Sequence, residues 1–395
     1  MGNKFSQQKP SGEKSKLITV TILHRHGARG PGASELSPWD DNCKNDIKRQ
    51  WKENEIEAIH ATGHAQIKTL GEWFVSKAKE VSAEEVAYFW RCSKSGRARE
   101  SGDDFTQAFN AKIGSEAFPK AGLPYDVDAD NYFRPWKIYE AESKISKQQC
   151  MLLQQPWFEM VHENEKFLRR IFAEVGAVDK MTNPIGNSLW ATTYLMALRE
   201  SEEFWPEPAA DDVGAERTAM AKTLTSKEDW EKVESIALWV WSQRFLSNGF
   251  QRKIGGKIAR EMLQRTLYND GSVNVFSGHD YTLLSLLSNL LPEGYKMKTP
   301  TSFGGYILLQ LWEGPPPTHS GLASCVHPQA SMKKTPFGAK ERVVRVIYNP
   351  CPFKNKENHV DGVVNDDKEE VLLELTLTEA EKIVKDIDDY FSYIA

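Results

Sequence analysis

The chain has 395 residues, of which 27% are charged and 40% hydrophobic, and its formal net charge is −5 at pH 7. This balance is typical of a folded globular protein that can bury a substantial core, rather than of a disordered or fibrous chain. The negative net charge and the scattered lysines and arginines argue against nucleic acid as a partner. No stretch approaches the ~18 apolar residues of a membrane-spanning helix.

The amino-terminal segment, residues 1–16, is polar, and we expect it to form a mobile tail. It lacks the apolar stretch of a secretory signal, so we expect a cytoplasmic protein. Its first residues match M-G-x-x-x-[ST], the pattern for N-myristoylation of Gly2. Nearby lysines would add electrostatic attraction to the weak binding of one acyl chain, so the sequence predicts reversible association with the cytoplasmic face of a membrane. An unmodified tail is the alternative.

The cysteines and histidines give no sign of a metal or cofactor. The five cysteines are an odd number without a C-x-x-C pair, a pattern that favours reduced thiols. His60 and His64 have the i,i+4 spacing of a helical zinc pair, but the glutamate of H-E-x-x-H is absent and no third ligand is apparent. We therefore expect no metal and no cofactor.

The amino-terminal part of the sequence predicts a strand, a helix and a second strand in that order. Residues 17–23 form a β-branched, apolar run that ends at His24, which is typical of a buried strand. Apolar residues at helical spacing predict a helix over 65–80, and residues 85–90 have the pattern of a second strand. This order favours a parallel sheet.

The middle of the chain, residues 116–240, is rich in tryptophan and in charged, helix-favouring residues, as in 155–175 and 226–245, and has no convincing strand pattern. In the last third, leucines at helical spacing follow Asp280, and strand patterns return at 273–276, 306–312, 343–348 and 371–375. The sequence thus predicts an α/β fold with a mostly parallel central sheet flanked by helices. Its core would comprise residues 17–115 and 241–395, and a mostly helical cap domain would be inserted at 116–240.

Ionisable residues follow three of the predicted strands. In an open α/β sheet, ligands bind at the carboxyl ends of the strands, so the loops after Leu23, Trp90 and Phe276 should converge. The three loops carry arginines, two histidines and an aspartate: Arg25, His26, Arg29, Arg91, Arg97, Arg99, His279 and Asp280. Hydrolysis of a phosphate monoester needs charge neutralisation, a nucleophile and a proton for the leaving oxygen, and this set can supply all three. Arg91 and Arg99 fit an ordinary solvated role equally well.

The residue types suit separate parts of that chemistry. The neutral imidazole of His26 can attack phosphorus without a metal and form a phosphohistidine. Asp280 can protonate the leaving alkoxide and then deprotonate the attacking water. The remaining members are donors for the phosphate oxygens, with arginine preferred because its planar fork donates two parallel hydrogen bonds: Arg25, Arg29, Arg97 and His279.

These loops resemble the signatures of a known family. Residues 25–29, Arg-His-Gly-Ala-Arg, resemble the R-H-G-x-R motif of the histidine phosphatase superfamily, and residues 277–280, Ser-Gly-His-Asp, resemble the S-x-H-D of its acid phosphatase and phytase branch. Residues 91–101 are similar to that branch's R-S-T-D-x-x-R-T-x-x-S, which carries its third phosphate-binding arginine onto Arg97. The resemblance spans residues 17–110 and 250–350, and it implies a metal-independent phosphatase.

The chain departs from the family pattern at three positions. Lys94 replaces the acid of the middle motif, Ala98 replaces its threonine, and His60 stands where the first helix usually has threonine. These changes remove no catalytic group, but they bear on substrate preference. Ser277 lacks the G-x-S-x-G elbow of a serine hydrolase and is expected to be structural.

The sequence therefore predicts a histidine acid phosphatase that acts on a phosphorylated small molecule or lipid. Two alternatives stay open. One is a phosphotransferase resembling phosphoglycerate mutase, against which the S-x-H-D motif and the long insertion speak. The other is a module that binds phosphorylated ligands without turnover, which Lys94 and Ala98 favour and which the presence of His26 and Asp280 disfavours. Neither the substrate nor the oligomeric state follows from the sequence.

Overall fold

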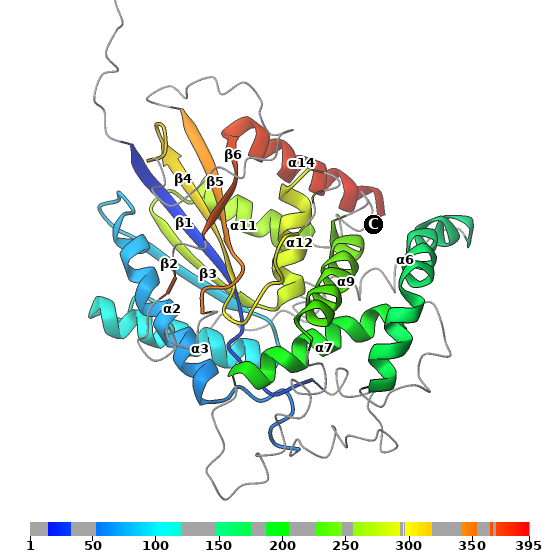
Figure 1. The fold of residues 1–395 in the computed structure, drawn as a ribbon. Helices are drawn as coiled ribbons and strands as arrows, with labels where there is room; N and C mark the ends of the chain where they lie inside the picture. The colour runs from blue at the N-terminus through cyan, green and yellow to red at the C-terminus, as the bar shows by residue number, and fades with distance from the viewer. Residues whose placement is uncertain are drawn as a thin grey trace, which may run out of the picture.

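The computed structural model describes residues 15–32, 53–119, 147–174, 187–204, 226–246, 256–292, 295, 297–317, 341–353, 364–365 and 369–394. The tail with Gly2 lies outside them. At the centre is a six-stranded sheet of order β2-β3-β1-β4-β5-β6 (Figure 1). The six strands are β1 (Lys16–Arg25), β2 (Ala87–Cys92), β3 (Ser272–Gly278), β4 (Tyr306–Glu313), β5 (Arg342–Asn349) and β6 (Glu370–Thr376). Each overlaps a segment for which the sequence predicted a strand, so the α/β class is confirmed.

The directions of the strands differ from the prediction. β1 and β2 both pair with β3 in parallel, whereas the pairs β1–β4, β4–β5 and β5–β6 are antiparallel. The prediction of a mostly parallel sheet is therefore wrong. A buried apolar run marks a strand but carries no information on its direction, and β4, β5 and β6 follow one another with no helix between them among the described residues.

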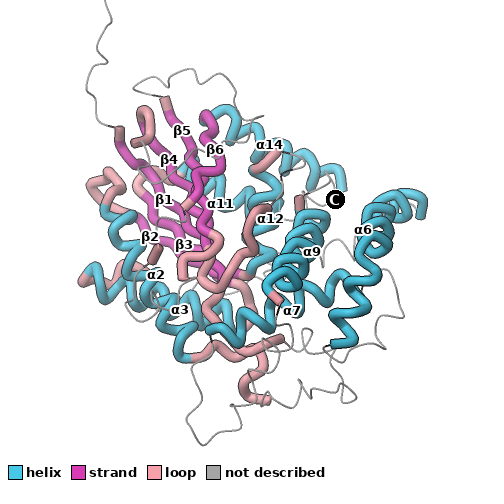
Figure 2. Tube along the Cα trace, viewed as in Figure 1, coloured by secondary structure: helices cyan, strands magenta, loops and turns pink. Residues whose placement is uncertain are grey.

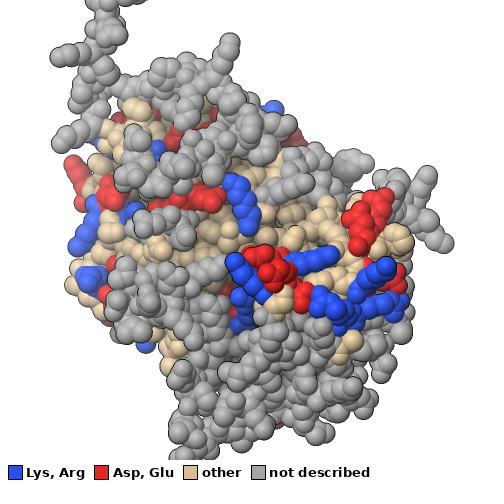
Figure 3. All heavy atoms as spheres, viewed as in Figure 1, with Lys and Arg blue, Asp and Glu red and all other residues tan. Residues whose placement is uncertain are grey.

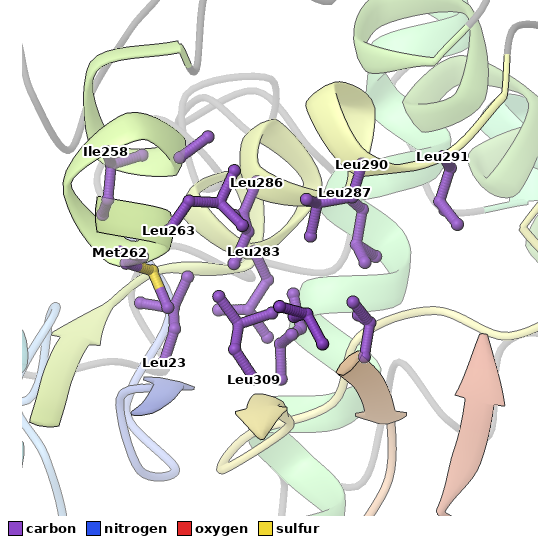
Figure 4. Packing of buried hydrophobic residues seen from close by; sticks show 14 of the residues in the cluster. Leu23, Ile258, Met262, Leu263, Leu283, Leu286, Leu287, Leu290, Leu291 and Leu309 are labelled. Carbon is purple, nitrogen blue, oxygen red and sulfur yellow. The ribbon is translucent and has the colours of Figure 1, made fainter. Parts of the chain in front are cut away.

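Helices cover both faces of the sheet (Figures 1 and 2). On one face, α2 (Ala61–Lys79) and α3 (Gly96–Ile113) share a hydrophobic cluster with Val20 and Ile22 of β1. On the other face, α11 (Gly256–Tyr268), α12 (Asp280–Leu290) and α14 (Leu377–Ile394) share a cluster with Leu23. Figure 4 shows leucines of α11 and α12 packed over Leu23 and Leu309. β1 therefore lies between two apolar layers, with alternate side chains entering each.

Three further helices are packed together: α6 (Lys147–Glu174), α7 (Asn187–Phe204) and α9 (Lys227–Phe245). They share a hydrophobic cluster of their own, which includes Leu195 and Val233. They lie within or across the end of the segment predicted to be helical, and the division of the chain into a core and a cap domain stays a prediction. Figure 3 shows Lys and Arg beside Asp and Glu on the face in view. No helix among the described residues is long and apolar enough to cross a membrane.

Candidate active site

The three predicted loops meet at the carboxyl ends of β1, β2 and β3. Arg25 pairs with Gly278 at the ends of β1 and β3. The backbone N–H of His26 donates to the carbonyl of Gly278 over 3.0 Å, and the N–H of Ser93 donates to the carbonyl of Ser277 over 3.0 Å. These bonds bring the ring of His26 to 5.4 Å from the ring of His279, measured between centroids. The structure thus confirms that the three loops converge.

The loop after β1 is fixed by the two helices beneath it. The N–H of Gly27 donates to the hydroxyl of Ser101 on α3 over 3.1 Å, and the N–H of Ala28 donates to the side-chain oxygen of Gln66 on α2 over 2.9 Å. A Cβ atom at Gly27 would lie 2.3 Å from the carbonyl oxygen of Gly63. Glycine is needed at position 27 because the loop and the first turn of α2 approach too closely for any side chain.

The tautomer and the protonation state of His26 follow from its surroundings. Nδ1 lies 2.9 Å from the carbonyl oxygen of Gly27, so Nδ1 carries the proton and Nε2 keeps its lone pair. Burial, followed by the positive charges of Arg97, Arg29 and Arg25, holds the pKa of His26 well below its usual value. The imidazole is therefore neutral, and Nε2 is the atom able to act as a nucleophile.

Arg25 is buried, with 2% of its surface exposed, and is surrounded by acceptors. Its Nη1 donates to Oε2 of Glu200 over 2.9 Å and to the carbonyl of Thr301 over 2.7 Å, and its Nη2 lies 3.3 Å from Oδ2 of Asp280. Its guanidinium carbon lies 4.3 Å from the ring centre of Phe303. Burial opposes the charge, but Glu200 and Asp280 outweigh it and raise the pKa of Arg25, so the guanidinium stays charged.

Glu200 of α7 is a site residue that the sequence analysis missed. One of its carboxylate oxygens binds Arg25, and the other, Oε1, accepts from the hydroxyl of Ser302 over 2.5 Å and from the N–H of Phe303 over 2.7 Å. It thus joins the end of β1 to the loop before β4. No motif marks it, because it belongs to a charge-rich helical stretch whose residues look alike until the fold places one of them against Arg25.

The two other predicted phosphate-binding arginines occupy separate elements. Arg29 is 5% exposed and its Nη1 donates to the carbonyl of Gly30 over 2.7 Å. Arg97 lies in the first turn of α3 rather than in a loop, and its Nη1 donates to Oε2 of Glu57 over 2.9 Å. Both act electrostatically on His26. By contrast, Arg91 points from β2 to Glu261 of α11, at 2.8 Å.

His279 and Asp280 begin α12. His279 is its N-cap residue, and its Nε2 lies 3.1 Å from the hydroxyl of Ser93. Asp280 is the first helical residue, and its Oδ1 accepts from the N–H of Tyr281 over 2.7 Å. Ser277, at the end of β3, donates its hydroxyl to the carbonyl of Ala98 over 2.7 Å. Ser277 therefore has the structural role expected of it, since it holds the first turn of α3.

His60 and His64, which have helical spacing, contact different partners. Nδ1 of His60 accepts from the N–H of Gly63 and caps α2, while Nδ1 of His64 lies 2.5 Å from Oδ2 of Asp104. In the part of the chain that the structure describes, no group of three or more His, Cys, Asp or Glu side chains could hold a metal ion.

Comparison with known proteins gives a match at the level of structure. No protein-family model matches the sequence, and the search of curated proteins found no match. Several solved structures of phytases are similar over nearly the whole chain. The phytase from Citrobacter braakii has a TM-score of 0.61 at 14% identity, with coverage of 94% of this chain and 98% of the phytase. The chain has the fold of this phytase.

Two further similar structures agree with this match. Hafnia alvei phytase in complex with myo-inositol hexakis sulphate has a TM-score of 0.59 at 14% identity, covering 96% of this chain and 98% of that one. The Bifidobacterium longum multiple inositol polyphosphate phosphatase in complex with phosphate has a TM-score of 0.51 at 11% identity, covering 96% and 94%. The phytase fold is thus the one implied by the motifs at 25–29 and 277–280.

Within the phytase fold, this site combines three kinds of group at one edge of the sheet. The neutral imidazole of His26 presents Nε2, and buried guanidinium groups supply fixed positive charge. The carboxyl group of Asp280 lies beside Arg25, and 25% of the Asp280 side chain is exposed. Such a set can bind a tetrahedral anion and exchange one of its oxygen substituents without a metal.

Proposed function

We propose that the chain hydrolyses phosphate monoesters through a phosphohistidine on Nε2 of His26. The observation that carries the proposal is the state of His26: Nδ1 is tied to the carbonyl of Gly27, and burial and three arginines keep the ring neutral. A neutral imidazole with a fixed lone pair is what an attack on phosphorus requires.

The proposed reaction has two displacements. Nε2 of His26 attacks phosphorus, the bond from phosphorus to the ester oxygen breaks, and Asp280 gives its proton to the departing alkoxide. Asp280 then takes a proton from water, whose oxygen attacks the phosphohistidine and breaks the P–N bond. The products are the alcohol and inorganic phosphate, and the residues return to their starting states.

The proposed phosphate contacts come from Arg25, Arg29, Arg97 and His279. Guanidinium groups stay charged at any working pH, and they offer paired donors to the three non-bridging oxygens. Glu200 holds Arg25 in place before substrate arrives, which reduces the reorganisation needed in the transition state.

For the substrate, we propose a phosphorylated small molecule or lipid, with inositol polyphosphates to be tested first. The support is the structural similarity to phytases and to a multiple inositol polyphosphate phosphatase. From the sequence pattern of the tail, we further propose a cytoplasmic protein that can attach to a membrane through an acyl chain on Gly2.

Trapping of the phosphoenzyme tests the proposal. Wild type, His26→Ala and the surface control His162→Ala would be mixed with a labelled phosphomonoester in the presence of a chelator, quenched and analysed for acid-labile phosphate. We expect label and phosphate release with wild type and His162→Ala, and neither with His26→Ala. Label on another residue, or activity that a chelator abolishes and a divalent ion restores, would overturn the mechanism. Adding an acceptor alcohol separates hydrolysis from phosphotransfer.

A further inference from the structure

Two serine hydroxyls converge on one nitrogen of His279. The hydroxyl oxygen of Ser93 lies 3.1 Å from Nε2 and that of Ser95 lies 3.3 Å from the same atom. Ser93 is fully buried and His279 is 1% exposed. A hydroxyl can both donate and accept, so the contact can form with either tautomer of the imidazole.

The two serines belong to the turn between β2 and α3. The N–H of Ser93 is bound to the carbonyl of Ser277, which fixes the turn against the end of β3. Ser95 is the N-cap of α3, and its hydroxyl accepts from the N–H of Ala98. Since the first turn of α3 also carries Arg97, one short segment joins the position of His279 to that of an arginine next to His26.

Stacking on Tyr281 does not by itself fix which way round the ring of His279 lies. The ring stacks on Tyr281, with centroids 4.7 Å apart and an angle of 24° between the planes. Stacking fixes the plane of the ring but permits a half-turn about the Cβ–Cγ bond, which exchanges nitrogen and carbon positions. Only one of the two orientations brings Nε2 to the serine hydroxyls.

We propose that Ser93, supported by Ser95, is a positioning residue for His279 that selects this ring orientation. The inference rests on the proposed function, in which His279 donates to the phosphate. Lys94, which replaces the acid of the family motif, is exposed between the two serines, and both hydroxyl contacts are present beside it.

Variants at position 93 test the inference. Threonine keeps the hydroxyl, and the family motif that residues 91–101 resemble has threonine at this position. Valine has the shape of threonine but lacks the hydroxyl. We expect Ser93→Val to lower kcat/KM for p-nitrophenyl phosphate about tenfold and to weaken inhibition by inorganic phosphate, while Ser93→Thr stays within about threefold of wild type. Ser288→Ala is the matched control, because Ser288 is a buried serine of α12 that donates to the carbonyl of Ser285.

A double-mutant cycle separates a positioning role from a general loss of stability. If Ser93 acts through His279, Ser93→Val should cause little further loss in a His279→Ala background. Additive losses, or equal losses in Ser93→Val and Ser93→Thr, would overturn the inference while leaving the proposed function intact. A wild-type protein that releases no phosphate would instead overturn the proposed function and this inference with it. Nuclear magnetic resonance of the His279 ring nitrogens, which needs no turnover, should show a changed signal in Ser93→Val and an unchanged one in Ser288→Ala.

Discussion

Arg25 and Glu200 lie 175 residues apart in the chain, yet their side chains meet at 2.9 Å. The contact joins the end of the central strand to helix α7. Because the same carboxylate also binds Ser302 and the backbone of Phe303, it ties the end of β1 to the loop before β4.

Removing the charge of Glu200 should therefore impair activity more than stability. We expect Glu200→Gln to lower kcat/KM on the order of tenfold and Glu200→Ala up to about a hundredfold, since the larger change also removes the acceptor for Ser302. Steady-state kinetics on p-nitrophenyl phosphate would measure both. Glu165→Gln is the control, because Glu165 pairs only with Arg169 in an exposed pair on α6 among the described contacts. Wild-type kinetics in both Glu200 variants would show that Arg25 does not depend on this contact.

Changing the leaving group of the substrate tests whether Asp280 acts as a general acid. A general acid matters most for a poor leaving group, since an alkyl alkoxide needs a proton and a nitrophenolate scarcely does. Asp280→Asn should slow hydrolysis of alkyl phosphates by a factor on the order of 10²–10⁴ and that of aryl phosphates far less. Rates for the two substrate classes, with phosphate inhibition measured in parallel, check this. Equal losses for both classes would make Asp280 a residue that orients Arg25, to which it lies 3.3 Å away.

The pH dependence of stability should contain a contribution from His24. This residue is fully buried and stacks on Phe105 at 5.0 Å, and burial lowers its pKa to about 4. Since the unfolded chain protonates near pH 6.5 and the folded chain does not, the contribution is intact above pH 6.5 and is lost as the pH falls toward 4. Between pH 6.5 and 5 the loss amounts to about 2 kcal/mol.

Replacing His24 with phenylalanine should remove that contribution. Urea unfolding at pH 7 and pH 5 should show a smaller fall in the free energy of unfolding for His24→Phe than for wild type. His60, whose pKa burial also lowers to about 4, would keep part of the pH dependence in both proteins. The exposed residue His162 serves as the control through His162→Gln, and an identical fall in all three proteins would contradict the prediction.

Acylation of Gly2 stays a prediction from the sequence pattern. Co-expression with an N-myristoyltransferase should increase the mass by one myristoyl chain, and the modified protein should sediment with vesicles that contain anionic lipid. Gly2→Ala is the control, since it removes the acceptor. An unchanged mass in the wild-type protein would leave the tail as an unmodified linker.

The sequence predicted those features that depend on local pattern. The buried run of β1, the leucine spacing of α12 and the positions of the six strands all follow from periodicity, and the histidines 26 and 279 follow from their place at strand ends. The direction of β4, β5 and β6 has no such local signature. The sequence does not predict α3, because half of its buried face consists of Ser101, Gly102 and Thr106 and the apolar periodicity is weak, so Arg97 is expected in a loop.

Contacts between distant segments account for the rest of what was missed. Glu200 is one of three glutamates within residues 200–203, and only the packing of α7 singles it out for contact with Arg25. The hydroxyls at 93 and 95 lay within a recognised motif, but their partner is 186 and 184 residues further along the chain. Side chains that act through a tertiary contact leave no trace in the spacing of their own segment.

The position of β1 in the sheet affects how the chain folds during its synthesis. Its neighbours in the sheet are β3 and β4. The hydroxyl of Thr21 accepts a hydrogen bond from the side chain of Asn274, which is made 253 residues later. At 5–20 residues per second, the ribosome needs on the order of 10–50 s to make the intervening chain. During that interval the nascent strand has an apolar surface on both faces and unpaired edges, which makes it a template for association with other chains. Residues 16–25 are therefore a segment to which we expect chaperones to bind during translation.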